Sequence, residues 1–476
     1  MKVFSPPWRP PGWRPTRATL QRLPLGLTLL TTAAFLLVPA LLMGRFPRPR
    51  AIGLEKLMAT VSLLQSFRAD PDRPVPEIWK ERFGPESADK LWRYQSRLWW
   101  QFWDGHADGP PFLALSSRGL PEPLSPGVAV PPLTVGDLSI FPPDRLSRQI
   151  LQDRLQPQVR SSPGVRLRCL PRMESEQAVF WRPAALGVLL GPLASFLQGF
   201  QEGCLSLTIG GDGLLWRGEA ASVEGMVLRV PEGLLGAPEL PVVPPPSPDV
   251  LLEAQGPSLE RLMAGLLARE LIRQPLAERY GLGPTQLTLL RQTPFRLVLR
   301  PRDQGPFQAS IELTLVTGLK QAQWKEWLER LADRLRKEDL RLLSPAARPG
   351  VSQPPPPPAG SKRAAVWPQA LWQRADGVVV GGWRWHGSQV GGDQITLFLG
   401  PPPSVPTRFV PSPVVNKGGM LLLARPQQLE DRGLLPGALP QVVKRSDWLW
   451  MAAEPFPGLG PEAPLNQLQG TLRLRP

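Results

Sequence analysis

The sequence predicts an α+β protein in which mostly antiparallel sheets carry amphipathic helices, with one N-terminal transmembrane helix and an internal duplication. Three observations predict this class. Residues 23–44 are uncharged, several alternating segments meet at glycine-rich turns, and other segments repeat their apolar residues at helical spacing. Hairpins that alternate with helices are typical of sheets that helices cover on one face.

The N-terminal helix is predicted from a run of apolar residues between Arg22 and Arg45. As a helix, residues 23–44 would be about 33 Å long, which is enough to cross a bilayer core of about 30 Å. Residues 1–22 form a basic, proline-rich tail before it. A cleaved signal peptide and a buried core helix are the alternatives, but the length of the uncharged run favours a retained anchor.

The charges around this segment predict its orientation. Residues 1–22 carry five cations and no acid, whereas the cations that follow the segment are accompanied by Glu55. This difference favours a cytoplasmic N-terminus. We therefore expect a single-pass protein of the inner or thylakoid membrane whose main domain is periplasmic or lumenal. Its expected partners are membrane lipid around the N-terminal helix and an envelope protein.

The net charge of +15 is not a nucleic-acid signal, because residues 1–50 alone hold eight cations and no acid. The remaining excess is spread among acidic residues, and no nucleic-acid recognition motif accompanies it. We expect no nucleic-acid partner.

Proline clusters divide the rest of the chain, which holds 62 prolines in total. The densest cluster includes Pro354–Pro358 and is typical of a stiff linker, with recognition of the polyproline run by a partner as the alternative. The predicted organisation is a first α+β region (51–240), a second (250–343), a linker (344–365) and a mostly β C-terminal region (366–476).

Within these regions the elements follow from periodicity. Helices are expected at Arg145–Leu155, Ser258–Gln274 and Gln321–Lys337. A hairpin turns at 210–213, and another joins Gly377–His386 to Gln394–Gly400 through a turn at 391–393. Because the two glycine turns are alike, they suggest a duplicated β-β-α unit.

A third hairpin joins Phe295–Arg300 to Ser310–Thr317 and leads into the helix at Gln321–Lys337. Its second strand alternates between apolar and polar residues, as in a strand with one buried face. The residues expected to face a core are Ile311, Leu313 and Leu315, and those expected to face water are Glu312 and Thr314.

The two cysteines, Cys169 and Cys204, are thirty-five residues apart, and each lies in or beside a predicted strand. Outside the cytoplasm they could form one disulfide, whereas in a reducing compartment they would be two buried thiols. The sequence leaves both alternatives open.

Tryptophan is unusually common, with 17 residues against two tyrosines. Four of them crowd the segment 91–104, where a helix would place Trp92, Trp99 and Trp103 on one face. Core packing is the simpler interpretation of this cluster. The alternative is that Trp92, Trp99, Trp100 and Trp103 lie at the membrane interface, which indole rings favour.

Side chains that could carry chemistry are few. The two histidines, His106 and His386, are far apart. Residues 104–109 begin like a calcium loop, but Leu115 stands where such a loop needs a bidentate carboxylate. The sequence shows no phosphate-binding loop, zinc-protease helix or nucleophile elbow. We therefore predict no metal site and no cofactor, and the catalytic residues of any enzyme activity are unknown.

The anchor, the strands around Leu205–Leu214, the hairpin Phe295–Thr317 and the helix Gln321–Lys337 together resemble uncharacterised membrane-anchored cyanobacterial proteins with a domain of unknown function. The resemblance covers residues 160–430. It implies the location and the architecture but no activity and no site.

These observations favour a membrane-anchored binding or scaffolding protein of the cell envelope without catalytic activity. The alternative is a membrane-tethered hydrolase whose carboxylates come together from distant segments.

Overall fold

The computed structural model describes residues 52–476 except 96–97, 105–108, 119, 121–129, 156–163, 184, 186–196, 198, 212, 223–246, 260–273, 276, 279, 304–307, 344–368, 387–392, 404–407, 436–440, 457–463 and 475–476. The described residues belong to one compact unit, Ala51–Pro476. The predicted tail, anchor and linker lie outside the described residues, as does most of the helix expected at Ser258–Gln274. Among the described helices, none is both long and apolar enough to cross a membrane.

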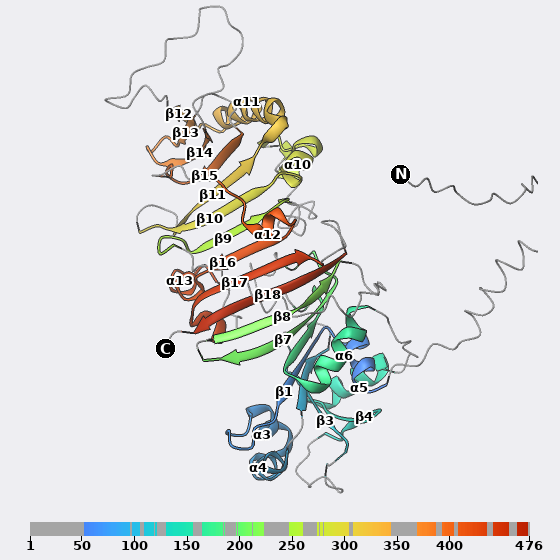
Figure 1. Ribbon diagram of the computed structural model, residues 1–476. Helices are drawn as coiled ribbons and strands as arrows, with labels where there is room; N and C mark the ends of the chain where they lie inside the picture. The colour runs from blue at the N-terminus through green and yellow to red at the C-terminus, as the bar shows by residue number, and fades with distance from the viewer. Residues whose placement is uncertain are drawn as a thin grey trace, which may run out of the picture. The chain divides into compact units, whose positions relative to one another are not determined.

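The described strands form one 18-stranded sheet in which every pairing is antiparallel. The predicted α+β class with several sheets was therefore wrong. The pairings give the spatial order β4-β5-β3-β2-β1-β6-β7-β8-β18-β17-β16-β9-β10-β11-β15-β14-β13-β12, and Figure 1 shows the central strands side by side. Periodicity identified individual hairpins, but it could not show which distant strands would pair and fuse them into one sheet.

The strand bounds follow. In chain order they are β1 (Leu63–Arg68), β2 (Leu98–Trp103), β3 (Phe112–Ser116), β4 (Leu133–Val135), β5 (Leu138–Phe141), β6 (Ala178–Trp181), β7 (Glu202–Gly210), β8 (Gly213–Ala221), β9 (Leu252–Gly256), β10 (Phe295–Pro301), β11 (Ala309–Val316), β12 (Arg341–Leu343), β13 (Gln369–Gln373), β14 (Val379–His386), β15 (Gln394–Leu399), β16 (Met420–Ala424), β17 (Ser446–Pro455) and β18 (Leu465–Leu474).

The strand order contains two equivalent halves. In the first half, β1 pairs with β2, β2 with β3 and β3 with β5, and on its other side β1 pairs with β6, followed by β7 and β8. In the second half, β9, β10, β11, β15, β16, β17 and β18 take these same positions in the same chain order. The glycine-turn duplication was wrong in detail, because the hairpin equivalent to β7–β8 is β17–β18 and not β14–β15.

The halves meet where β8 pairs with β18 over their whole length, from Leu465 opposite Ala221 to Arg473 opposite Gly213. Gly213 allows this close pairing, since a Cβ at that position would overlap the carbonyl oxygen of Leu472. The seam is therefore continuous backbone hydrogen bonding, and neither half presents its inner edge to solvent.

Helices lie on both faces of the sheet. We call face A the face that carries Phe295, Leu297 and Leu313, and face B the opposite face, which carries Arg296 and Thr314. The helices are α2 (Leu54–Thr60), α3 (Glu77–Phe83), α4 (Pro85–Tyr94), α5 (Arg145–Leu155), α6 (Val165–Ser175), α10 (Pro284–Arg291), a 3-10 turn (Gly318–Lys320), α11 (Gln321–Lys337), α12 (Pro413–Asn416), α13 (Pro426–Asp431) and α14 (Gln441–Lys444). The helices predicted at 145–155 and 321–337 are confirmed as α5 and α11.

Each region of the sheet has its own cover. In the first half, α2, α5 and α6 bury face B around Phe102 and Phe180. The pair α3–α4 buries face A of β2, β3 and β5 around Trp99, Leu113 and Phe141. In the second half, α10 and α11 bury the end of face A at Phe295 and Leu315. The helix-bearing connections therefore fix which parts of the sheet stay accessible.

Candidate functional site

On face A of β10, β11 and β15, six apolar side chains lie beyond the cover that α10 and α11 provide among the described residues; four of them are partly buried against the neighbouring core, and two are exposed. The register aligns them in two adjacent rows. None of these side chains is buried, and Ile311 and Leu399 are 36% and 60% exposed. We call the six residues the open apolar patch: Leu297, Leu313 and Leu397 in one row, and Leu299, Ile311 and Leu399 in the next.

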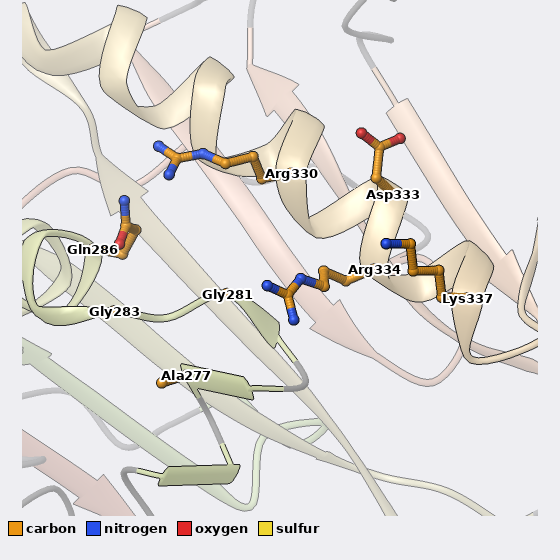
Figure 2. A pocket seen from close by; sticks show the side chains of 8 residues that line it. All are labelled: Ala277, Gly281, Gly283, Gln286, Arg330, Asp333, Arg334 and Lys337. Atoms are coloured by element: carbon orange, nitrogen blue, oxygen red, sulfur yellow. The ribbon is translucent and has the colours of Figure 1, made fainter.

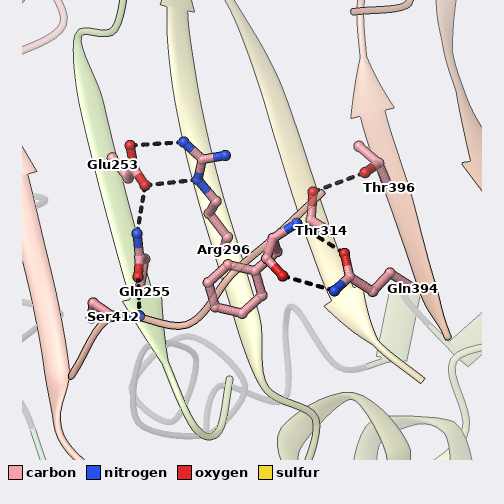
Figure 3. Close-up of polar contacts among 8 residues, drawn as sticks. Glu253, Gln255, Arg296, Thr314, Gln394, Thr396 and Ser412 are labelled. Carbon is pink, nitrogen blue, oxygen red and sulfur yellow. Dashed lines mark hydrogen bonds and ion pairs between the residues drawn. The ribbon is translucent and has the colours of Figure 1, made fainter. Parts of the chain in front are cut away.

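Face B of the same strands is polar and largely buried (Figure 3). Arg296 donates to both carboxylate oxygens of Glu253, from Nε at 2.7 Å and from Nη2 at 3.1 Å. The amide nitrogen of Gln255 donates to the same carboxylate at 2.6 Å, and the hydroxyls of Thr314 and Thr396 bond to each other at 2.8 Å. Each of these buried polar groups therefore has a partner, which limits the cost of removing it from water.

A segment of the chain crosses this polar surface. The side-chain amide of Gln394 donates to the carbonyl of Phe409 at 2.8 Å and accepts from its backbone N–H at 2.9 Å. The backbone N–H of Ser412 donates to Gln255 (Figure 3), and α12 follows directly. We call residues 408–416 the strap. Face B is thus covered by the protein's own chain.

The hairpin β10–β11 therefore reverses part of the orientation expected from its sequence. Leu315 lies in the core as predicted, but Ile311 is exposed, whereas Thr314 is only 6% exposed. The prediction for Glu312 and Thr314 was wrong because alternation separates two faces without showing which face another segment will cover. The open apolar patch lies on face A, opposite the face that the strap covers.

A basic pocket of about 400 Å³ lies between α10 and α11 (Figure 2). Arg330, Arg334 and Lys337 follow one another at one-turn spacing on α11, and Gln286 faces them from α10. The remaining lining residues are Ala277, Gly281, Gly283 and Asp333. Trp324, Trp327 and Leu328 are buried beneath α11 and hold the helix on face A.

A second pocket, of about 470 Å³, brings two carboxylates together beside α6. Asp137 comes from the β4–β5 turn and Glu174 from α6, and Arg68, Ser116 and Ser175 line the same hollow. Burial, together with the negative charge of Asp137, raises the pKa of the Glu174 carboxyl. Both carboxylates are exposed side chains.

The structure joins Cys169 and Cys204 in a disulfide, with Cα atoms 5.8 Å apart. Cys204 lies on β7, but Cys169 lies on α6 and not in or beside a strand as expected. Both residues are fully buried. The bond attaches α6 covalently to face B.

The four tryptophans proposed for a membrane interface do not share a helix. Trp92 lies in the last turn of α4, whereas Trp99, Trp100 and Trp103 lie on β2, so their predicted helical face was wrong. Trp92 and Trp99 are 4% exposed and pack edge-to-face, and the indole of Trp100 donates to the carbonyl of Met173. Trp103 is half-buried. These contacts are those of core packing, the simpler interpretation of the cluster.

The remaining polar candidates form no common centre. His386 is bonded to Thr396 at 2.6 Å, and burial, assisted by Arg384 and Arg408, lowers its pKa. His106 and most of the 104–109 loop lie outside the described residues, and the carboxylate of Asp104 is paired with Arg154. The described residues contain no cluster of metal-ligating side chains.

Comparison with protein-family models, with curated proteins and with solved structures finds no match for this chain. The resemblance to membrane-anchored cyanobacterial proteins therefore stays a prediction. Sequence reasoning missed the basic pocket, although the spacing of Arg330, Arg334 and Lys337 was a readable signal. It missed the open apolar patch because nothing in local alternation reveals an uncovered face.

Proposed function

We propose that this chain is a non-catalytic binding or scaffolding protein of the cell envelope, and that the open apolar patch binds an amphipathic helix of a partner protein. The observation that supports the proposal most is the partial reversal of the β10–β11 hairpin, in which Ile311 is exposed and Leu297, Leu299 and Leu313 are only partly buried, whereas Ser310 and Thr314 are buried. Contiguous exposed apolar surface is typical of interaction sites.

The first half supports the choice of a helix as the occupant. On the equivalent strands β2, β3 and β5, face A is covered by the helix pair α3–α4, which inserts Trp79, Phe83 and Trp92. The open apolar patch spans three strands, about 10 Å between the outer two, which matches the diameter of a single helix. An apolar stripe along a partner helix would bury both rows of the patch.

The location belongs to the same proposal. The main domain is periplasmic or lumenal, and the N-terminal apolar segment holds the protein at the inner or thylakoid membrane. The buried Cys169–Cys204 disulfide supports an oxidising compartment, because disulfides persist mainly outside the reducing cytosol. Tethering at a membrane would also raise the local concentration of any membrane-bound partner.

The proposal is tested with a photo-crosslinking amino acid at position 311 of the full-length protein in its native membranes. The matched control is position 319, because Leu319 is a fully exposed apolar residue outside the patch. We expect crosslinks from 311, and not from 319, that map to an apolar helical face of one partner protein. The substitution L399D should then weaken binding of that purified partner about tenfold or more.

Crosslinks from 311 that map only to residues 258–274 of this chain would contradict the proposal, because the patch would then be covered from within. Crosslinks only to lipid would contradict it as well.

The hydrolase alternative is supported by one observation, the raised pKa of Glu174 beside Asp137. A carboxyl whose pKa is raised can act as a general acid nearer neutral pH. If it does, the purified protein should hydrolyse at least one member of a panel of ester, glycoside and phosphoester substrates. The variant E174Q should lose that activity. The variant R68Q, which also changes the pocket, should keep the alkaline limb of the pH–rate profile, because that limb reports deprotonation of the Glu174 carboxyl.

A further inference from the structure

The basic pocket between α10 and α11 has more positive charge than its own neighbours neutralise. Asp333 is the acid that lines it, and its carboxylate is already paired at 2.6 Å with Arg336, which does not line the pocket. Lys337 has no partner among the described residues. The pocket therefore presents two guanidinium groups and one ammonium group, and among the described residues only Arg330 of these three is paired with a carboxylate, that of Glu326.

The two arginines are only partly engaged. Arg330 pairs with Glu326, one turn away on α11, at 3.1 Å, and Arg334 donates to the backbone carbonyl of Glu278. Each guanidinium has five N–H donors, so both keep donors for a ligand. In Figure 2, Arg334 extends toward the loop that contains Gly281 and Gly283, and Arg330 extends toward Gln286, whereas Asp333 points away from both.

The arrangement fits a tetrahedral oxyanion with more than one negative charge. Guanidinium forks bind phosphate oxygens through paired charged hydrogen bonds, and an ammonium adds a point charge. The amide of Gln286 supplies a further neutral donor from the opposite wall. A singly charged carboxylate would leave most of this charge unmatched.

We infer that this pocket binds a phosphate group, either as free phosphate or as the headgroup of an anionic phospholipid. The inference does not rest on the partner-helix proposal, because the pocket residues and the open apolar patch share no member. Either could fail while the other holds.

Phosphate binding is measured by isothermal titration calorimetry on the full-length protein in detergent, with chloride at equal ionic strength as the reference. The test variant is R330Q/K337Q, which leaves the backbone contact of Arg334 intact. The control is K325Q/R341Q, which removes the same charge from α11 and β12 but from no residue of the pocket. Circular dichroism checks that each variant is folded. If R330Q/K337Q does not fold, the single variant K337Q takes its place as the test variant.

Wild-type protein and the control should bind phosphate saturably, and R330Q/K337Q should weaken binding about tenfold or more, because each charged hydrogen bond contributes strongly. Equal weakening in the control, or no saturable binding of either free phosphate beyond chloride or phosphatidylglycerol beyond phosphatidylcholine, would overturn the inference. Short-chain phosphatidylglycerol, with phosphatidylcholine of the same chain length as reference, identifies the source. If phosphatidylglycerol binds and its binding depends on Arg330 and Lys337, the site is assigned to a lipid headgroup. If free phosphate binds and phosphatidylglycerol does not, the site is assigned to free phosphate.

Discussion

The two halves of the sheet share one strand order but secure their covering segments differently. In the first half, the β5–β6 connection crosses face B as α5 and α6, and it is attached by the disulfide and by the Arg166–Glu202 and Arg168–Glu219 ion pairs, both at 2.8 Å. In the second half, the equivalent β15–β16 connection crosses face B as the strap, which is attached by hydrogen bonds of Gln394 and Gln255 and by the packing of Val414 against Leu421, Leu423 and Trp450.

Face A shows the same contrast. The pair α3–α4 covers β2, β3 and β5 in the first half, whereas the equivalent strands β10, β11 and β15 carry the open apolar patch. Among the described residues, one topology therefore yields a half whose face A is covered and a half whose face A is covered only in part. The difference teaches that the connections, and not the strand order, decide where this protein offers surface for binding.

The largest effect is expected for R166M in the first half. This change leaves the carboxylate of Glu202, which is 0% exposed, without its guanidinium partner. Breaking a buried pair on one side typically costs about 3–5 kcal/mol of unfolding free energy. Chemical denaturation measures it. The double variant R166M/E202M should recover most of the loss, and equal losses in both variants would contradict this account of the pair.

Removal of the disulfide should have the next largest effect. The bond closes a loop with a sequence separation of 35 residues, and C169A/C204A should cost about 3–4 kcal/mol in the chain-entropy description. Denaturation of the oxidised protein and the variant measures the difference, after a non-reducing peptide map has shown the bond. A variant as stable as the oxidised protein would show that the ion pairs alone hold α6.

A matched pair of leucines compares the two halves directly. Leu113 on β3 is 0% exposed beneath α3–α4, whereas Leu313 on the equivalent strand β11 is only half-buried in the patch. We expect L113A to cost about 2–4 kcal/mol and L313A about 1 kcal/mol or less, since a filled site loses more packing than an open one. Equal losses would mean that the patch is covered in solution.

A smaller effect than that of L113A is expected for the strap. The variant Q394A leaves the buried backbone N–H and C=O of Phe409 without partners, which should cost about 1–3 kcal/mol. Amide hydrogen exchange should speed up at Phe409 and Ser412 while β9 and β10 stay protected. The exposed control Q292A should change neither measurement, and global loss of protection in Q394A would show that the strap is not a separate unit.

Local features of the fold were predictable from the sequence. The helix at Gln321–Lys337 and the hairpins β7–β8, β10–β11 and β14–β15 follow from periodicity and glycine turns. The β8–β18 pairing could not be predicted, because the alternation of apolar and polar residues in one strand does not identify which distant strand it pairs with. The helix predicted for segment 91–104 was wrong because the tryptophans from Trp99 to Trp103 fit helical and extended spacing equally well. Pairing with β1 and β3 determines that this part of the segment is a strand.

The candidate sites were less predictable than the fold. Each depends on which covering segment is present or missing over a given face. The basic pocket needed the packing of α10 against α11, and the carboxylate pocket needed the β4–β5 turn to meet α6. Ion pairs such as Arg296–Glu253 join residues that only the register brings together.

The β8–β18 seam has a consequence for how the protein is made. The last described strand of the chain, β18, lies at the centre of the sheet. During synthesis, the edge of β8 that pairs with β18 therefore stays unpaired until all the residues between the two strands have been made. An unpaired edge of this length is a template for joining another nascent chain. A truncation that removes β18 would therefore damage more than the C-terminus, because it would leave two inner edges, β8 and β17, free to associate with other molecules.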